Sequence, residues 1–298
     1  MRALIFAHFD PHDVVDPHVL YSLRCYRPYF DTIYFVSTSR LDEKYIKLAR
    51  SLVDVVICRE NVGYDFASWR VGFEGLRLHG YDEVAFANDS CYGPCKDPAS
   101  LFESLQLSDS NLWGVAVNHQ YRPHVQSFFM VFRRELIESG FASYFWSNVN
   151  PPSDKLNIIL DYEVGLSSAV ESAGFKIGGL INFVTPDFET RNRVAEDNIP
   201  HIAGEEWERV KQYILTENYP NPLQLYWKES MRLGCPLIKV ELLRDNPLGA
   251  NLNNILEELR VSRWYDTNLI GCHMDRIAPA AWKNLFGSRG CFSESICS

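Results

Sequence analysis

The chain has 298 residues, a mass of 34.3 kDa, a formal net charge of -9 and a pI near 5.4. This acidic balance argues against a nucleic-acid partner, because neutralising phosphates needs a surface rich in lysine and arginine. No run approaches the roughly 18 uninterrupted apolar residues of a membrane-spanning helix. We therefore expect a soluble, cytoplasmic globular protein that is long enough to bury a substantial core.

The amino terminus and the cysteines fit this class. Residues 1–8 are largely apolar, but the segment reaches His8, and Asp10 comes soon after, before a signal-peptide cleavage site could form. This segment is therefore interpreted as a first buried strand. The eight cysteines are expected to stay reduced in the cytosol. Their spacings do not match a paired zinc motif.

Strand and helix patterns alternate through the first half of the chain. Phe66, Trp69, Phe73 and Leu76 recur at three- and four-residue steps, which predicts a helix between two strands. Such alternation is typical of a mostly parallel sheet flanked by helices, an α/β, Rossmann-like fold. The strand candidates are residues 3–7, 32–37, 53–58, 83–87, 112–117 and 128–132.

The pattern changes after the Pro-rich loop at 148–153, because strands become scarce and helical periodicity dominates. We therefore expect an α-rich carboxyl-terminal lobe, with portions at 1–150 and 151–286 and a poorly ordered tail at 287–298. The helix candidates are residues 161–174, 205–217, 222–234, 251–260 and 263–272.

A first polar loop follows the strand at 53–58. Gly63 permits a tight backbone path close to a ligand, while Asn61 and Asp65 offer hydrogen-bonding groups to a base, a ribose or a sugar. The structural alternative is that Asp65 caps a helix beginning at Phe66. Both roles can coexist.

A second polar loop, Asn88-Asp89-Ser90, follows the next predicted strand. Ligands bind at the carboxyl ends of strands in open α/β sheets, so the two loops are predicted to meet at one crevice. Asp89 can hold a divalent cation that bridges a diphosphate, or it can bind sugar hydroxyls directly. The structural alternative is a turn in which Asp89 and Ser90 bond to their own backbone.

A third candidate is the acidic pair Asp161 and Glu163, placed by the periodicity in the first turn of a helix. The positive end of the helix dipole would keep such a carboxylate ionised and available as a base. The structural alternative is that Asp161 caps the helix and Glu163 is a solvated charge.

These segments, taken in order, resemble the rhamnan synthesis protein F family of bacterial polysaccharide glycosyltransferases, which have a GT-A-like fold. The resemblance extends from residue 1 to about residue 250. It is carried by Asn61-x-Gly63-Tyr64-Asp65, Asn88-Asp89-Ser90-x-Tyr92-Gly93-Pro94, Gln126-Ser127-Phe128-Phe129, Tyr162-Glu163-Val164-Gly165-Leu166, Asn221-Pro222, Cys235-Pro236 and Arg244-x-Asn246-Pro247.

The resemblance implies that the first portion holds a nucleotide-sugar donor and the second an acceptor glycan. Asn61, Gly63 and Asp65 would line the nucleotide pocket, and Ser127 would face the donor sugar. Asn88, Asp89 and Ser90 would occupy the place of the acidic metal motif of GT-A enzymes. A Mg²⁺ or Mn²⁺ ion is therefore expected at Asp89, with His273 as a late ligand. Because one aspartate stands where the family usually has two, metal independence is the other expectation.

The mechanism that the resemblance implies is single displacement with inversion. Glu163 would take the proton of an acceptor hydroxyl, with Asp161 as the reserve base. Lys239 and Arg244 would neutralise the departing nucleotide diphosphate if no metal does. An ordinary surface ion pair is the alternative for both cations.

The expected setting is cell-surface polysaccharide assembly, such as O-antigen or cell-wall biogenesis. The acceptor would be a glycan, which can be lipid-linked, so peripheral association with the inner face of the cell membrane is a further expectation. The sugar is open among rhamnose, galactofuranose and other hexoses. Two other functions stay open: a non-catalytic glycan-binding or assembly subunit, and a sugar-phosphate transferase of the same pathway.

Overall fold

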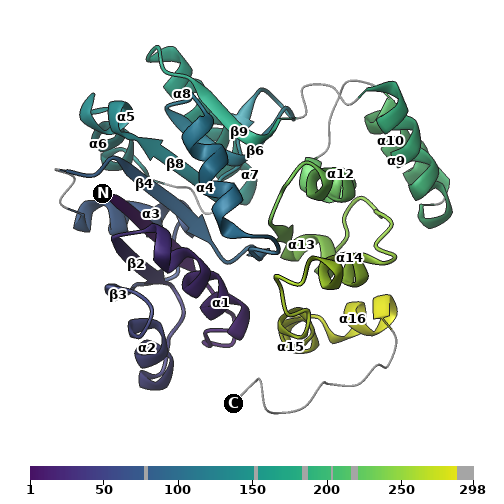
Figure 1. Ribbon diagram of the computed structural model, residues 1–298, viewed down its shortest axis with the longest axis horizontal. Coiled ribbons are helices and arrows are strands. Elements are labelled where there is room, and N and C mark those ends of the chain that lie inside the picture. Colours follow the sequence, from purple (N-terminus) through teal and green to yellow (C-terminus); the bar gives the residue numbers. More distant parts are fainter. Residues whose placement is uncertain (77–79, 151–153, 183–186, 203, 216–220, 287–298) are drawn as a thin grey trace. The chain divides into compact units, whose positions relative to one another are not determined.

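The computed structural model describes residues 1–76, 80–150, 154–182, 187–202, 204–215 and 221–286 (Figure 1). The predicted tail at 287–298 therefore lies outside the described residues. The chain divides into two compact units, each built from separate stretches of sequence. The sheet unit contains Met1–Asp89, Leu101–Val117 and Tyr121–Leu180, and the helical unit contains Ser90–Ser100, Asn118–Gln120 and Ile181–Ser298. A functional division near residue 150 stays a prediction.

An eight-stranded sheet forms the sheet unit, with the order β3-β2-β1-β4-β8-β6-β7 and β9 paired to β6. Pairs among the first four strands of this order are parallel, whereas β8 runs antiparallel to both β4 and β6. The predicted mostly parallel α/β sheet is thus confirmed. The strands are β1 (Arg2–His8), β2 (Thr32–Ser37), β3 (Val55–Cys58), β4 (Glu83–Asn88), β6 (Leu112–Asn118), β7 (His124–Val125), β8 (Phe129–Arg133) and β9 (Ile177–Asn182).

Helices flank this sheet, as the alternation predicts (Figure 1). Helix α3 packs on β1 and β2, and α6 packs on α3. The helical elements of this part of the chain are α1 (Pro17–Tyr26), η1 (Arg27–Tyr29), α2 (Glu43–Arg50), α3 (Tyr64–Gly75), α4 (Pro98–Leu107), α5 (Arg134–Glu138), α6 (Phe141–Ser147), α7 (Lys155–Ile158), η2 (Ile159–Val164) and α8 (Gly165–Ser172).

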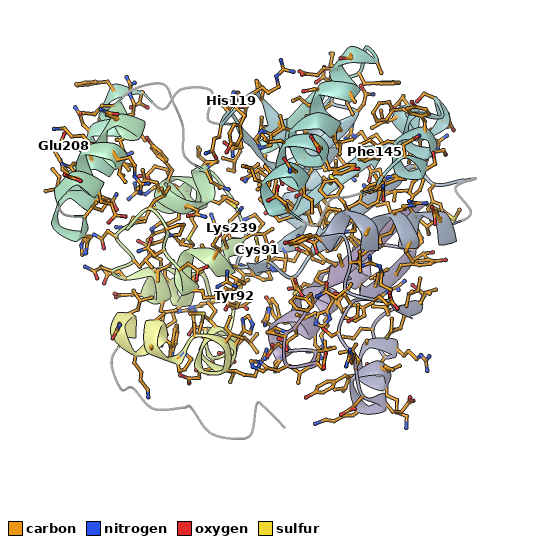
Figure 2. All side chains as sticks on the ribbon, turned by 180° about the vertical axis from the view of Figure 1, so that it is seen from behind. Cys91, Tyr92, His119, Phe145, Glu208 and Lys239 are labelled. Atoms are coloured by element: carbon orange, nitrogen blue, oxygen red, sulfur yellow. The ribbon has the colours of Figure 1, made fainter. Side chains whose placement is uncertain are left out.

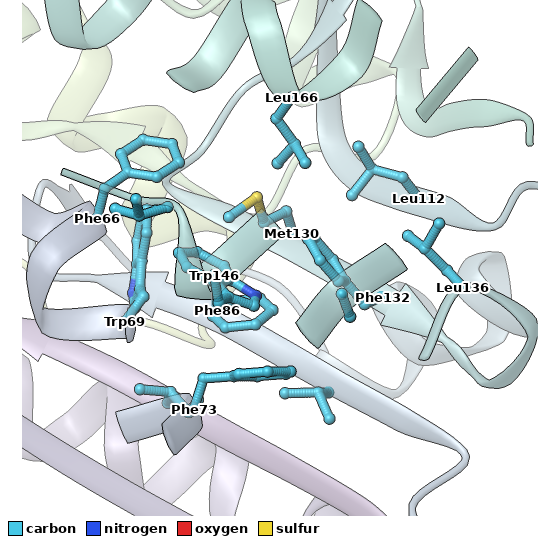
Figure 3. Close-up of a cluster of buried hydrophobic side chains, with 14 of the residues drawn as sticks. Phe66, Trp69, Phe73, Phe86, Leu112, Met130, Phe132, Leu136, Trp146 and Leu166 are labelled. Atoms are coloured by element: carbon cyan, nitrogen blue, oxygen red, sulfur yellow. The ribbon is translucent and has the colours of Figure 1, made fainter. Parts of the chain in front are cut away.

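Large aromatic side chains fill the core between α3, α6 and the sheet (Figure 3). Phe86 on β4 lies at the centre, with its ring centroid 4.6 Å from that of Trp146 and 5.0 Å from that of Phe132. Trp69 and Trp146 are both 0% exposed. The periodic apolar face predicted at Phe66, Trp69 and their neighbours is therefore the face that α3 buries.

The helical unit is α-rich, as predicted, and its short strands β5 (Cys91–Tyr92) and β10 (Ile238–Lys239) pair in antiparallel fashion. Lys239 stands opposite Cys91 in this pair (Figure 2). The described helices of the chain include none long and apolar enough to cross a lipid bilayer. The helical elements are α9 (Phe188–Asn198), η3 (Ile199–His201), α10 (Gly204–Leu215), α11 (Pro222–Leu225), α12 (Trp227–Arg232), α13 (Val240–Arg244), α14 (Ile255–Ser262), α15 (Asn268–Ile277) and α16 (Pro279–Phe286).

Candidate functional site

The carboxyl end of β4 is fastened to helix α3 by two side-chain hydrogen bonds. Asn88 Nδ2 donates to Asp65 Oδ2 at 2.7 Å, and the indole Nε1 of Trp69 donates to the carbonyl of Ala87 at 2.9 Å. Strands β2 and β1 separate β3 from β4 in the sheet, so the two polar loops do not follow adjacent strands. They meet because α3, which begins after the first loop, crosses over β1 and β2.

The first loop turns through two residues in the left-handed region. Gly63 has φ of 80° and Tyr64 has φ of 53°. The helix begins at Tyr64 with Gly63 in the capping position, so the interpretation of Asp65 as the cap of a helix beginning at Phe66 is wrong. Asp65 lies within the first turn instead, where its carboxylate reaches Asn88. Asn61 is exposed in the same loop.

Arg59 organises this loop, although its sequence context did not single it out. Its Nη1 donates to Ser68 Oγ at 3.1 Å, and its Nη2 donates to the carbonyl of Val62. Burial lowers the pKa of Arg59, and the negative charge of Asp65 opposes that shift. The guanidinium therefore places a positive charge near Asp65 at this edge of the sheet.

Asp89 follows the last residue of β4 and turns toward the end of β1. Its Oδ2 accepts a hydrogen bond from the backbone N–H of Phe9 at 2.8 Å and lies 3.9 Å from His8 Nε2. The side chain is 19% exposed. Burial, and next the negative charge of Asp65, raise the pKa of Asp89 well above its usual range, and Asp10 adds to the effect.

The end of β1 is thus part of the candidate site, and sequence reasoning missed it. Ala7 is paired with Asn88 in the parallel register of β1 and β4, so His8, Phe9 and Asp10 come out beside Asp89. The rule that ligands bind at the carboxyl ends of parallel strands applies to this segment too. That rule, applied to the first predicted strand, would have pointed to it.

The donor atoms around Asp89 decide whether this edge suits a metal ion. A divalent cation would relieve the repulsion among Asp10, Asp65 and Asp89 that the raised pKa of Asp89 reflects. In the described ranges, however, these three side chains do not bring three ligand oxygens within 4.8 Å of one another. Within the described ranges, Asp10, Asp65 and Asp89 therefore do not form a complete metal site by themselves.

Glu163 lies on a π-helical segment inside a longer helical run. Helix α7, the π-helix η2 and α8 follow one another without a break from Lys155 to Ser172. Glu163 is therefore not in the first turn of a helix, and the proposed activation of Asp161 or Glu163 by the helix dipole is wrong, because that effect fades within one turn. Single π-helical turns inside α-helices are frequent at functional sites.

The Glu163 carboxylate is held from both sides. Its Oε2 accepts hydrogen bonds from the backbone N–H of Ser127, at 2.8 Å, and from Ser127 Oγ. Its Oε1 lies 3.4 Å from Nε2 of His124, a ring that is 1% exposed. The Glu163 side chain itself is 15% exposed, whereas Asp161 is exposed to solvent. Glu163 is thus oriented and partly shielded, which suits a general base better than Asp161 does.

Glu163 and Asn88 lie at the same end of the sheet. Strand β8 is antiparallel to β4 with Ala87 opposite Phe129, and the N–H of Asn88 donates to the carbonyl of Phe128 at 3.3 Å. Ser127 directly precedes Phe128, so the residue that holds Glu163 is at the carboxyl end of β4. A shared ligand cavity for Glu163 and Asp89 stays a prediction.

Four predicted site residues belong to the helical unit. The carbonyl of Ser90 accepts from the N–H of Val240 at 2.9 Å, and Lys239 is part of β10. Arg244 contacts Asp245 at 2.6 Å, and this hydrogen bond raises the pKa of Arg244. His273 is buried, with Nδ1 2.7 Å from the hydroxyl of Tyr92. Their roles toward a donor or a metal stay predictions.

A hollow of about 440 Å³ lies away from all of these residues. Its lining includes Arg2, Asp82 and Glu83, which stand at the amino-terminal side of β1 and β4. Ligands of open α/β sheets bind at the opposite, carboxyl edge. The chemistry of the carboxyl edge is therefore the better guide to the functional site.

Comparison with known proteins gives one family match and several relatives. A model of the family described as rhamnan synthesis protein F matches residues 33–202. The virulence protein VirA of Vibrio anguillarum is 29% identical over 205 residues, which cover 66% of this chain and 64% of VirA. The uncharacterized protein y4gN of Sinorhizobium fredii is 29% identical over 133 residues, which cover 42% of this chain and 34% of y4gN. The chain thus spans less than two thirds of the length of either relative.

Solved structures match more distantly. A cytidylyltransferase from Leptospira borgpetersenii has a TM-score of 0.35 and 12% identity, covering 78% of this chain and 96% of that one. A putative nucleotide-diphospho-sugar transferase from Desulfovibrio desulfuricans has a TM-score of 0.34 and 9% identity, covering 74% of this chain and 99% of that one.

Proposed function

Since the chain belongs to the rhamnan synthesis protein F family, we propose that it is an inverting glycosyltransferase of cell-surface polysaccharide assembly. It transfers rhamnose or another hexose from a nucleotide-sugar donor to a growing glycan. Fold class alone does not carry this proposal, because one fold supports many functions. The support comes from the family and from the polar residues gathered at the carboxyl edge of the sheet.

The observation that carries the proposal is the fixed carboxylate of Glu163. Ser127 holds one of its oxygens and His124 faces the other, so the group is oriented before any substrate arrives. In the proposed reaction Glu163 removes the proton of an acceptor hydroxyl. The hydroxyl oxygen attacks the anomeric carbon, and the bond from that carbon to the diphosphate breaks, its electron pair leaving with the nucleotide diphosphate.

The donor side is proposed to use Asn61, Gly63, Asp65, Asn88 and Asp89. Gly63 shapes the loop, while the Asp65–Asn88 bond keeps the two segments together. The leaving diphosphate needs positive charge. Lys239 and Arg244 remain our candidates for that role, and Arg59 is a further guanidinium that the sheet unit supplies beside Asp65.

Binding is the first test, because a ligand that binds the native state raises apparent stability. We would measure thermal shifts with nucleoside diphosphates and their sugars, each with and without Mg²⁺ or Mn²⁺. A shift that needs the metal would support a cation held jointly by Asp89 and the diphosphate. A shift of equal size without metal would support metal independence.

Catalysis is tested with Glu163→Gln, which keeps the size and the hydrogen-bond acceptor of the side chain but removes its basicity. Loss of a general base lowers kcat about 10²- to 10⁴-fold. Glu171→Gln is the matched control, because Glu171 is exposed on α8 of the same helical run. The base assignment fails if both variants transfer sugar at the wild-type rate.

A non-catalytic glycan-binding or assembly subunit is the second candidate. The observation that favours it is that protein groups already face both Glu163 oxygens, as a purely structural carboxylate would require. Glycan binding without release of nucleotide from any donor in the panel would establish this candidate instead. A product that gains a phosphoglycosyl unit, measured by mass, would identify a sugar-phosphate transferase.

A further inference from the structure

His124 is a buried histidine whose hydrogen positions follow from its partners. The residue forms β7 with Val125, and its ring is 1% exposed. Ring atom Nδ1 lies 2.8 Å from the carbonyl oxygen of Arg122. A carbonyl oxygen can only accept a hydrogen bond, so Nδ1 carries the hydrogen. In the neutral ring, Nε2 therefore bears the lone pair.

This lone pair faces the candidate base. Nε2 lies 3.4 Å from Glu163 Oε1, and it makes no hydrogen bond to any group in the described parts of the chain. While the ring is neutral, neither Nε2 nor the ionised Oε1 has a hydrogen to share with the other. A proton that arrives from a bound acceptor would change this contact into a charge-assisted hydrogen bond. The neutral ring beside the carboxylate can therefore receive one proton during the reaction.

We propose that His124 is the positioning residue of Glu163 and that its Nε2 is the final acceptor of the proton that Glu163 removes from the acceptor hydroxyl. This inference rests on the proposed transferase function and deepens it. A proton relay would explain why the two oxygens of the Glu163 carboxylate have different neighbours. Ser127 fixes Oε2 by hydrogen bonds, while Oε1 is directed toward the imidazole.

The proton and the electrons balance in this relay. The acceptor O–H bond breaks, its proton goes to the carboxylate, and the electron pair of the oxygen forms the bond to the anomeric carbon. The bond to the leaving diphosphate breaks with its pair. The carboxyl then passes a proton from Oε1 to His124 Nε2, which restores the carboxylate and forms an imidazolium. The resulting ion pair is more stable than a neutral carboxyl beside a neutral ring in a polar, oriented setting.

Among the described residues, Nε2 of His124 has no hydrogen-bond partner that would compete with Glu163. Arg122, two residues earlier, offers its carbonyl to Nδ1 and extends its guanidinium to Ser168 Oγ at 3.4 Å. From the helical run, Glu163 faces the His124 ring, and the Oγ of Ser167 accepts a hydrogen bond from the N–H of Val125 at 2.9 Å. Glu163 is thus the charged side chain that these contacts place against the ring.

Nitrogen NMR of protein labelled with ¹⁵N-histidine tests the pairing without any substrate. At alkaline pH we expect His124 to carry hydrogen on Nδ1 and not on Nε2. In Glu163→Gln the amide that replaces the carboxylate can donate a hydrogen bond to Nε2, so the nitrogen signal of Nε2 should move. The proposal is overturned if His124 carries its hydrogen on Nε2 at alkaline pH, or if Glu163→Gln leaves the Nε2 signal unchanged.

Steady-state kinetics with the best donor and acceptor then tests whether His124 accepts the proton or only orients Glu163. His124→Gln places an amide near Nε2 that can orient Glu163 but cannot accept a proton. A relay predicts that kcat falls about 10- to 100-fold with KM unchanged. His119→Gln is the control, because His119 bonds Asn182 through Nε2 at 2.8 Å in the helical unit. Wild-type kcat in His124→Gln overturns the relay.

The two experiments fail in different ways. If no donor is turned over by the wild type, the proposed function fails, and the NMR result alone decides whether His124 and Glu163 share the proton. If His124→Gln is unfolded, the NMR comparison of wild type with Glu163→Gln still stands, because both keep His124.

Discussion

Two buried tryptophans of one core differ in a single hydrogen bond, which makes them a matched pair for mutation. Trp69 and Trp146 are both 0% exposed, and both pack near Phe86. Trp69 Nε1 donates to the carbonyl of Ala87 at 2.9 Å. Trp146 Nε1 has no hydrogen-bond partner among the described residues. Replacing each by phenylalanine removes the same part of the indole.

The expected losses follow from these contacts. Deleting part of a buried ring costs about 1–3 kcal/mol through lost packing at either site. Trp69→Phe also removes the hydrogen bond to the Ala87 carbonyl, which adds about 0.5–1.5 kcal/mol. Trp146→Phe instead removes a buried N–H without a partner, which offsets its packing loss by about 1–3 kcal/mol. We therefore expect Trp69→Phe to be less stable than Trp146→Phe by at least about 1.5 kcal/mol.

Urea unfolding followed by far-ultraviolet circular dichroism measures this difference, provided that the two variants keep equal m values. Trp69→Phe should also weaken any thermal shift produced by a donor, since Ala87 directly precedes Asn88 at the site. If the two variants lose the same unfolding free energy to within about 0.5 kcal/mol, the hydrogen bond from Trp69 to Ala87 does not stabilise the packing of α3 on β4.

Three further predictions concern single residues. Gly63→Ala should cost about 1–2 kcal/mol in unfolding free energy and reduce donor-induced thermal shifts, because Gly63 has φ of 80°. Asp89→Asn should be more stable than wild type, and this advantage should grow as the pH rises above about 4. Because the pKa of Asp89 is raised in the folded state, the folded wild type binds more protons than the unfolded chain between the unfolded and the folded pKa. The stability of the wild type therefore falls as the pH rises through that range. Urea midpoints at several pH values check this, and a constant or shrinking advantage contradicts it. Burial raises the pKa of Cys235 to about 12, so little reactive thiolate forms there at a pH near 8. Iodoacetamide at that pH should label the exposed Cys58 first and Cys235 only when the protein unfolds, and mass spectrometry of the labelled protein measures this order.

Local patterns in the sequence were sufficient for the elements and for part of the site. Alternating strand and helix signals indicated the α/β class, since burial on one face imposes its period on the residues that form it. The apolar steps from Phe66 to Phe73 identified the buried face of α3. Gly63 marked the turn, because few other residues adopt its left-handed backbone.

Short or atypical elements escaped these patterns. Strand β7 has two residues, too few to show any alternation, and β9 contains two glycines that weaken a strand signal. Helix α9 did carry a capping signal, since Asp187 accepts from the N–H of Thr190 at 2.7 Å, and that signal was missed. The π-helical turn at Glu163 has no local sequence code, so the helix start was misplaced.

Tertiary structure alone decided which residues meet. The strand order places the end of β1 beside Asp89, although 80 residues separate Phe9 from Asp89 in the chain. The pairing of His124 with Glu163 likewise depends on how a short edge strand packs against a helical run. The periodicity of the sequence indicates which face of a helix or strand is buried. Which residues from distant parts of the chain come into contact depends on how whole elements pack together, and no local sequence pattern contains that information.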